Sequence, residues 1–145
     1  MRTKDFLGKL EHARIVAAIE RAELKSSGEI RVHIERGNIS GDPLELATKK
    51  FQETGMHKTR ARNAVLIFVA PRAQSFAIVG DEAVHQKCGD AYWQRITEAM
   101  RAHFREGRFT EALEEAIRDV GSVLAEHFPR KPDDRNELPD AVMES

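Results

Sequence analysis

The chain of 145 residues has the length of one domain, and its 41% hydrophobic and 32% charged residues are typical of a folded, soluble protein. Lysine and arginine (23) nearly balance aspartate and glutamate (24), which argues against bulk attraction to nucleic acid or to an acidic membrane surface. The single cysteine excludes an intramolecular disulfide and an all-cysteine zinc site. The longest apolar run, residues 64–70, is far shorter than the ~20 residues of a membrane span, and we expect no signal peptide and a cytoplasmic location.

The first part of the chain predicts a helix followed by a strand. Apolar residues between about 11 and 25 recur at the spacing of one helical face, and Gly28 follows as a stop. Residues 29–35 alternate polar and apolar side chains with period two, which predicts a strand with one buried face.

A second helix has a strong start at Asp42-Pro43-Leu44-Glu45. Aspartate accepts hydrogen bonds from the first turn, proline suits the first helical position, and glutamate follows three residues after the cap. We expect Leu44, Ala47 and Phe51 to form the inward stripe of this helix.

Two strands are predicted at residues 65–69 and 76–79. The first is continuously apolar and β-branched, as in a strand buried on both faces. The short turn between them is too short for a crossover, so the two strands form an antiparallel hairpin. The strand at 29–35 connects to 65–69 through a helix and should lie parallel to it.

The second half predicts two helices. The first runs from about Asp90 to Gly107, and the second from about Thr110 to the residues before Pro129. Charged and proline residues dominate 129–145, which predicts a disordered tail after a domain of residues 1–128. The order α-β-α-β-β-α-α predicts an α/β fold, a three-layer α/β/α sandwich around a small mixed sheet.

This topology predicts which loops meet. Because the 65–69 and 76–79 strands are antiparallel, residues 80–82 should lie beside residues 60–63. The turn at residues 26–29 should lie at the same end of the sheet, since its strand runs parallel to the second one.

Four segments of the chain together resemble the TPM-domain family. Residues 18–32 resemble its first helix and strand, and residues 62–67 its second strand. Residues 76–81 resemble its third strand, and residues 93–109 its helical hairpin. The resemblance implies an α/β/α sandwich, divalent-metal binding in some members, and acid phosphatase activity in plant members. It also implies a protein partner, such as a small membrane protein of the LemA type found near bacterial members. One departure concerns the metal: Arg62-Asn63-Ala64 stands where exported members carry Asp-Asn-Gly, so a cation replaces a carboxylate.

The candidate metal ligands are Asn63, Asp81, Glu82 and Asp90, whose oxygens suit Ca²⁺ or Mg²⁺. An alternative is that Asp90 caps the helix that follows it, while Asp81 and Glu82 pair with arginines. We expect metal binding to be weak or absent.

Arginines at positions 60 and 62 are the candidate anion-binding residues, within a basic segment between Lys49 and Arg72. Solvated loop charge is the alternative, and no aromatic platform for nucleic-acid bases accompanies the segment. His85 and Cys88 have the spacing of two zinc ligands, but a second pair is lacking. The remaining histidines show no metal-site spacing, and we expect most of them to face solvent or to form structural hydrogen bonds.

No nucleophile–base pair or phosphate-binding motif is present. We therefore expect a non-enzymatic binding domain that engages a protein partner through the loops at residues 26–29, 60–63 and 80–82. One form of this hypothesis has a membrane-associated partner. The alternative is a metal-dependent acid phosphatase in which Asp81, Glu82 and Asp90 hold the metal and Arg62 stabilises charge.

Overall fold

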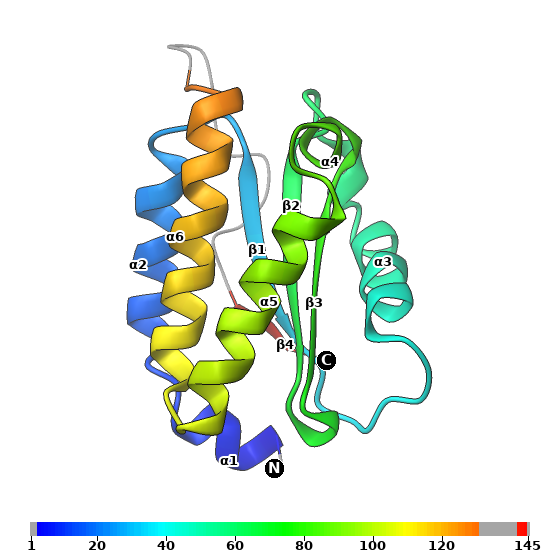
Figure 1. The fold of residues 1–145 in the computed structure, drawn as a ribbon, viewed down its shortest axis with the longest axis vertical. Coiled ribbons are helices and arrows are strands. Elements are labelled where there is room, and N and C mark those ends of the chain that lie inside the picture. The colour runs from blue at the N-terminus through cyan, green and yellow to red at the C-terminus, as the bar shows by residue number, and fades with distance from the viewer. Residues whose placement is uncertain (1–2, 131–141, 145) are drawn as a thin grey trace.

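The computed structural model describes residues 3–130 and 142–144 of the chain. Helices cover both faces of a four-stranded sheet (Figure 1), so the predicted three-layer α/β/α sandwich is confirmed. The main elements are α1 (Thr3–Gly8), α2 (His12–Glu23), β1 (Glu29–Ile34), α3 (Pro43–Glu53), β2 (Ala64–Ala70), β3 (Ser75–Gly80), α4 (Glu82–Cys88), α5 (Asp90–Arg105), α6 (Phe109–His127) and β4 (Val142–Glu144).

The sheet has the strand order β3-β2-β1-β4. β1 and β2 are parallel and joined through α3, whereas β2 and β3 form an antiparallel hairpin, both as predicted. The hairpin register pairs Val65 with Gly80 and Ala70 with Ser75. One face of the sheet buries Ile30, Val32 and Ile34 under α2, α5 and α6.

The second face of the sheet packs against α3. Ala47 of α3 contacts the cluster around Phe68 of β2, and Phe51 packs with Leu66. The Asp42 side chain caps α3 by accepting a hydrogen bond from the amide of Leu44 at 3.1 Å. The predicted inward position of Leu44 is wrong, because its side chain is 47% exposed.

The prediction that β1 buries only one face is also wrong. All six of its residues are buried, and Arg31 and His33 on the polar face are 5% and 2% exposed. β1 lies between β2 and β4, and strands inside a parallel array are covered on both faces.

A short helix, α4, separates β3 from α5 and was not predicted. It ends at Gly89, whose φ of 75° is readily adopted by glycine, and α5 begins at Asp90 as expected. Gly107, also at a φ of 75°, follows α5 as predicted.

The C-terminal segment makes contacts where a disordered tail was expected. Val142–Glu144 pairs in parallel with β1, and Arg130 donates a hydrogen bond from Nη1 to the carbonyl of Glu23 at 2.8 Å. Residues 131–141 and 145 lie outside the described residues, so for these the tail stays a prediction, as does the domain boundary at residue 128. Within the described ranges, no helix combines the length and hydrophobicity that a membrane span requires.

Candidate functional site

Three segments that are far apart in the sequence meet at one end of the sheet. They are residues 26–29, 60–63 and 80–82, and we call this surface the loop end. The amide of Asp81 donates to the carbonyl of Ala64 at 2.9 Å, and the amide of Ala83 donates to the carbonyl of Arg62 at 3.1 Å. The predicted convergence of these loops is therefore confirmed.

The central contact of the loop end is the ion pair between Arg62 and Asp81. Arg62 donates from Nε to Oδ2 and from Nη2 to Oδ1, both at 2.8 Å, in the bidentate geometry of the strongest charge-assisted hydrogen bonds. The Asp81 side chain is only 5% exposed, whereas that of Arg62 is half-buried. The hydrogen bonds to Asp81 raise the pKa of Arg62 above its ordinary value.

Asp81 also caps the N-terminus of α4. Its Oδ1 accepts a hydrogen bond from the amide of Glu82 at 2.8 Å, so both of its carboxylate oxygens have donors. The exposed Glu82 carboxylate lies 3.7 Å from Nη2 of Arg62. The carboxylates at 81 and 82 are thus held by a guanidinium, which is the alternative arrangement considered from the sequence.

The other two predicted metal ligands have different surroundings. Asn63 is buried and donates from Nδ2 to Oγ of Ser27 at 3.0 Å, which ties two of the loops together. Asp90 is 79% exposed and lies 3.6 Å from Nε2 of His85. It is not the cap of α5, because Gly89 occupies that position.

The hard carboxylate oxygens of the loop end are already paired with the guanidinium of Arg62. Asp81 and Glu82 are the carboxylates that could bind Ca²⁺ or Mg²⁺, and the guanidinium of Arg62 would have to leave first. Among the described residues, no group of three or more His, Cys, Asp and Glu side chains is arranged to hold a metal ion. Arg60, the other predicted anion-binding residue, is exposed.

Arg31 and His33 form a buried polar stripe on β1 that was not predicted from the sequence. His33 stacks on Phe68 with a centroid distance of 5.7 Å and an interplanar angle of 12°. Burial, with Lys50 nearby, lowers the pKa of His33, and burial also lowers the pKa of Arg31. The parallel pairing of β1 with β2 was the available signal, because parallel strands are covered on both faces.

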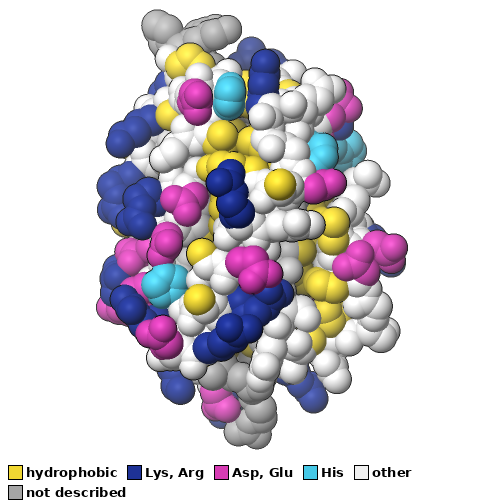
Figure 2. All heavy atoms as spheres, in the orientation of Figure 1, with side chains coloured by type: hydrophobic (Ala, Val, Ile, Leu, Met, Phe, Trp, Pro, Cys, Tyr) yellow, Lys and Arg dark blue, Asp and Glu magenta, His cyan; other side chains and the backbone are white. Residues whose placement is uncertain are grey.

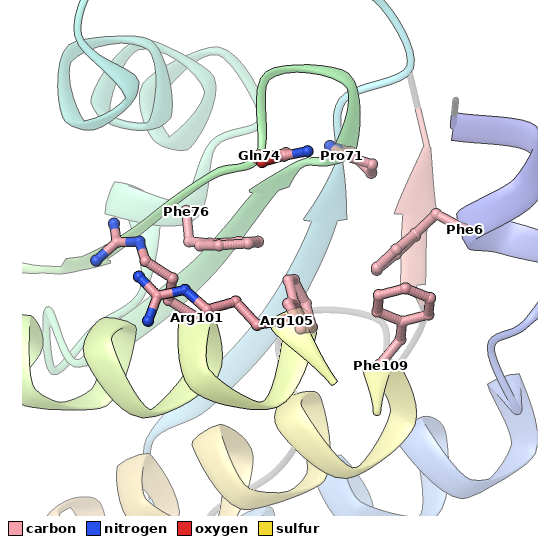
Figure 3. Close-up of a pocket in the computed structure, with 8 residues that line it drawn as sticks. Phe6, Pro71, Gln74, Phe76, Arg101, Arg105 and Phe109 are labelled. Carbon is pink, nitrogen blue, oxygen red and sulfur yellow. The ribbon is translucent and has the colours of Figure 1, made fainter. Parts of the chain in front are cut away.

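A pocket of about 390 Å³ lies at the opposite end, beside the turn of the β2–β3 hairpin (Figure 3). Its described lining combines phenylalanines with two arginines of α5 and includes no carboxylate or nucleophile. These residues could bind an anion, but they supply no catalytic group. The lining residues are Phe6, Pro71, Gln74, Phe76, Arg101, Phe104, Arg105 and Phe109.

Comparison with solved structures finds proteins of similar fold. The NMR structure of BA42 from the psychrophilic bacterium Bizionia argentinensis is 36% identical, covers 93% of this chain and 92% of its own, and has a TM-score of 0.84. An N-terminal domain from P. gingivalis is 22% identical over 79% of this chain and 76% of its own, with a TM-score of 0.63. The N-terminal domain of cg2496 from Corynebacterium glutamicum is 19% identical over 77% of this chain and 70% of its own, with a TM-score of 0.59.

These last two likenesses show a shared fold only. Among curated proteins, none matches the sequence. The family model for the TPM domain matches residues 1–123, which span all the described elements up to most of α6. The chain therefore belongs to the TPM-domain family.

Proposed function

We propose that this TPM domain is a non-enzymatic binding domain that engages a protein partner through the loop end, with weak or absent divalent-metal binding. The observation that supports this most is the two-point contact of Arg62 with Asp81. The contact holds a positive charge against the Asp81 carboxylate, which a metal ion would need as a ligand. It also links the segment before β2 to the start of α4.

The loop end has the properties of a preorganised recognition surface. Two contacts hold its three segments together: the hydrogen bond between Asn63 and Ser27 and the ion pair between Arg62 and Asp81. Binding of a partner therefore costs little conformational entropy in these loops. Arg60 and Glu82, two exposed side chains of opposite charge, give this surface an electrostatic pattern that a partner can recognise.

Affinity capture from native extract tests the partner surface. Glu82→Arg should reduce recovery of a specific partner, because it reverses a charge on the loop end. Glu98→Arg is the matched control, since Glu98 is similarly exposed but lies on α5. A LemA-type membrane protein is the first partner to examine, as the family resemblance suggests. Equal recovery with both variants would contradict the proposed surface.

A phosphatase assay on the purified protein tests the alternative function, a metal-dependent phosphatase. Hydrolysis of p-nitrophenyl phosphate should not exceed that of Asp81→Ala, with or without EDTA. Activity that EDTA abolishes and that Asp81→Ala lacks would favour the phosphatase and contradict a purely binding function.

A further inference from the structure

The outer edge of β3 presents backbone groups that are not used by the sheet. The amide of Asp81 bonds to Ala64, and the carbonyl of Val69 accepts from Glu35 next to β1. Hydrogen bonding alternates along an antiparallel pair, so the amide and carbonyl groups of Phe76, Ile78 and Gly80 point away from β2. Among the described residues, no strand pairs with this edge.

A groove of about 500 Å³ runs along this edge, with α3 as one wall and α5 as the other. Figure 2 shows hydrophobic side chains on this side of the molecule, where β3 lies between α5 and α3 in Figure 1. Leu44, one of two large hydrophobic side chains that the described chain leaves exposed, lines the groove with Trp93 and Ile78.

The sequence of β3 lacks the residues that usually protect an edge strand against pairing. Natural sheets block free edges with lysine, proline or a bulge, and Ser75–Gly80 contains no lysine or proline and pairs with β2 in an unbroken register. The edge lies at the bottom of the groove between α3 and α5, where Phe76 and Ile78 are 8% and 3% exposed, so a pairing segment has to enter the groove.

We propose that the β3 groove binds an extended peptide segment of a partner protein, which adds to the sheet as a fifth strand. The backbone of the segment pairs with Phe76, Ile78 and Gly80, as in known cases of strand addition at a sheet edge. Its central side chains are small or apolar, because they face Leu44 and Trp93.

The charges of the groove specify the ends of the segment. Asp42, which caps α3, and Asp90 at the start of α5 line the groove, and α3 and α5 begin toward opposite ends of β3 (Figure 1). Among the described residues, no lysine or arginine lines the groove. The bound segment therefore carries lysine or arginine next to its apolar centre.

A second copy of this chain does not fit the same edge. Its own β3 is recessed between α3 and α5, and two recessed edges cannot approach to the roughly 4.8 Å of paired strands. Among its described lining residues this groove shares only Gly80 with the loop end, and the inference does not depend on the proposed function.

Selection from a phage-displayed library of random heptapeptides against the full chain tests the proposal. Selected peptides should alternate apolar and polar positions, carry lysine or arginine, and shift the NMR amide signals of Phe76, Ile78 and Gly80. N-methylation at the backbone positions of one alternating register should weaken binding at least about tenfold, whereas methylation of the other register should not. Recovery of no peptide, shifts confined to other surfaces, or indifference to both methylations would overturn the proposal.

Substitutions in the groove provide a second readout. Leu44→Ala should weaken binding of a selected peptide about fivefold by removing apolar contact, while Leu24→Ala, at the other exposed leucine, should not change it. Asp42→Asn with Asp90→Asn should weaken binding at low salt and abolish its salt dependence, because asparagine keeps the cap of α3 without the charge. Equal effects of Leu44→Ala and Leu24→Ala would contradict binding in the groove.

Discussion

Arg62 lies in the left-handed region of backbone space, with a φ of 52°, one residue before the buried Asn63. Few residues other than glycine, asparagine and aspartate adopt this conformation readily. The side chain of Arg62 makes the two-point contact with Asp81. This contact stabilises a backbone conformation that arginine does not favour. The hairpin register predicted that these residues meet, but the two-point geometry depends on a backbone angle that no sequence pattern specifies.

The capping residues illustrate the same limit. Asp90 was a reasonable cap for the helix it precedes, yet Asp81 caps a helix that was not expected and Gly89 precedes α5. Both aspartates match the pattern of a helix cap. Which of them caps a helix depends on where one helix ends and the next begins, and that boundary lies at Gly89.

His33 provides a prediction about pH. Its neighbours are Phe68, Lys50, Glu35 and Arg31, and burial is the main cause of its lowered pKa. The unfolded chain then binds a proton more readily than the folded protein, so the free energy of unfolding should fall as the pH drops below about 6.5.

Urea unfolding at pH 7.5 and pH 5.5 measures this effect. His33→Phe keeps an aromatic ring on Phe68 and removes the titration, so the variant should lose less stability between these pH values than the wild type. An equal loss in both proteins would show that His33 does not contribute.

At the scale of elements, long patterns were predictable and short ones were not. α2, α3 and α6 each repeat apolar residues over several turns, and their positions follow from that spacing. α4 has seven residues, and Val84 is its only fully buried position, so its apolar pattern is too short to recognise. The polar face of β1 was misassigned because alternation does not reveal what covers a strand.

The contact between β3 and α5 leads to a prediction about Gly80. A Cβ atom at this position would lie 2.6 Å from Cζ2 of Trp93, so Gly80→Ala should lower the free energy of unfolding by about 1–3 kcal/mol. The indole Nε1 of Trp93 donates to Nδ1 of His85 at 3.2 Å, and displacement of the ring should also change the fluorescence of the single tryptophan.

Gly8→Ala is the matched control, because nothing lies within 4 Å of the added atom and the position is helical. It should not destabilise the protein. If Gly80→Ala unfolds at the same urea concentration as the wild type and leaves the emission unchanged, the close packing of β3 on α5 is wrong.

At the scale of the whole molecule, the layered architecture followed from a few constraints. A parallel pair needs a crossover, a short turn needs an antiparallel pair, and the helices must cover the faces that remain. β4 could not be predicted, since Val142–Glu144 is three residues long within a polar segment and pairs only because β1 has a free side.

Truncation tests the predicted domain of residues 1–128. The shortened chain should fold but lose about 1–3 kcal/mol of stability, because three cross-strand pairs with β1 and the hydrogen bond from Arg130 to Glu23 disappear. A chain ending at residue 130 should have intermediate stability in urea unfolding. An unfolded 1–128 chain would show that the domain extends further.

The central proposal is that Arg62 occupies the Asp81 carboxylate that a divalent ion would need, so that the loop end serves partner recognition and binds Ca²⁺ weakly or not at all. Arg62→Asp removes this cation, adds a hard oxygen ligand and suits the left-handed backbone, as does the neutral control Arg62→Asn.

The most direct measurement is a Ca²⁺ titration of the wild type and both variants, followed by amide NMR. The wild type should show no saturable shift at residues 62, 63, 81 and 82, Arg62→Asn at most weak shifts, and Arg62→Asp saturable shifts with at least about tenfold tighter binding than Arg62→Asn. Tight binding of Ca²⁺ at the loop end of the wild type, or no gain in Arg62→Asp, would contradict the account.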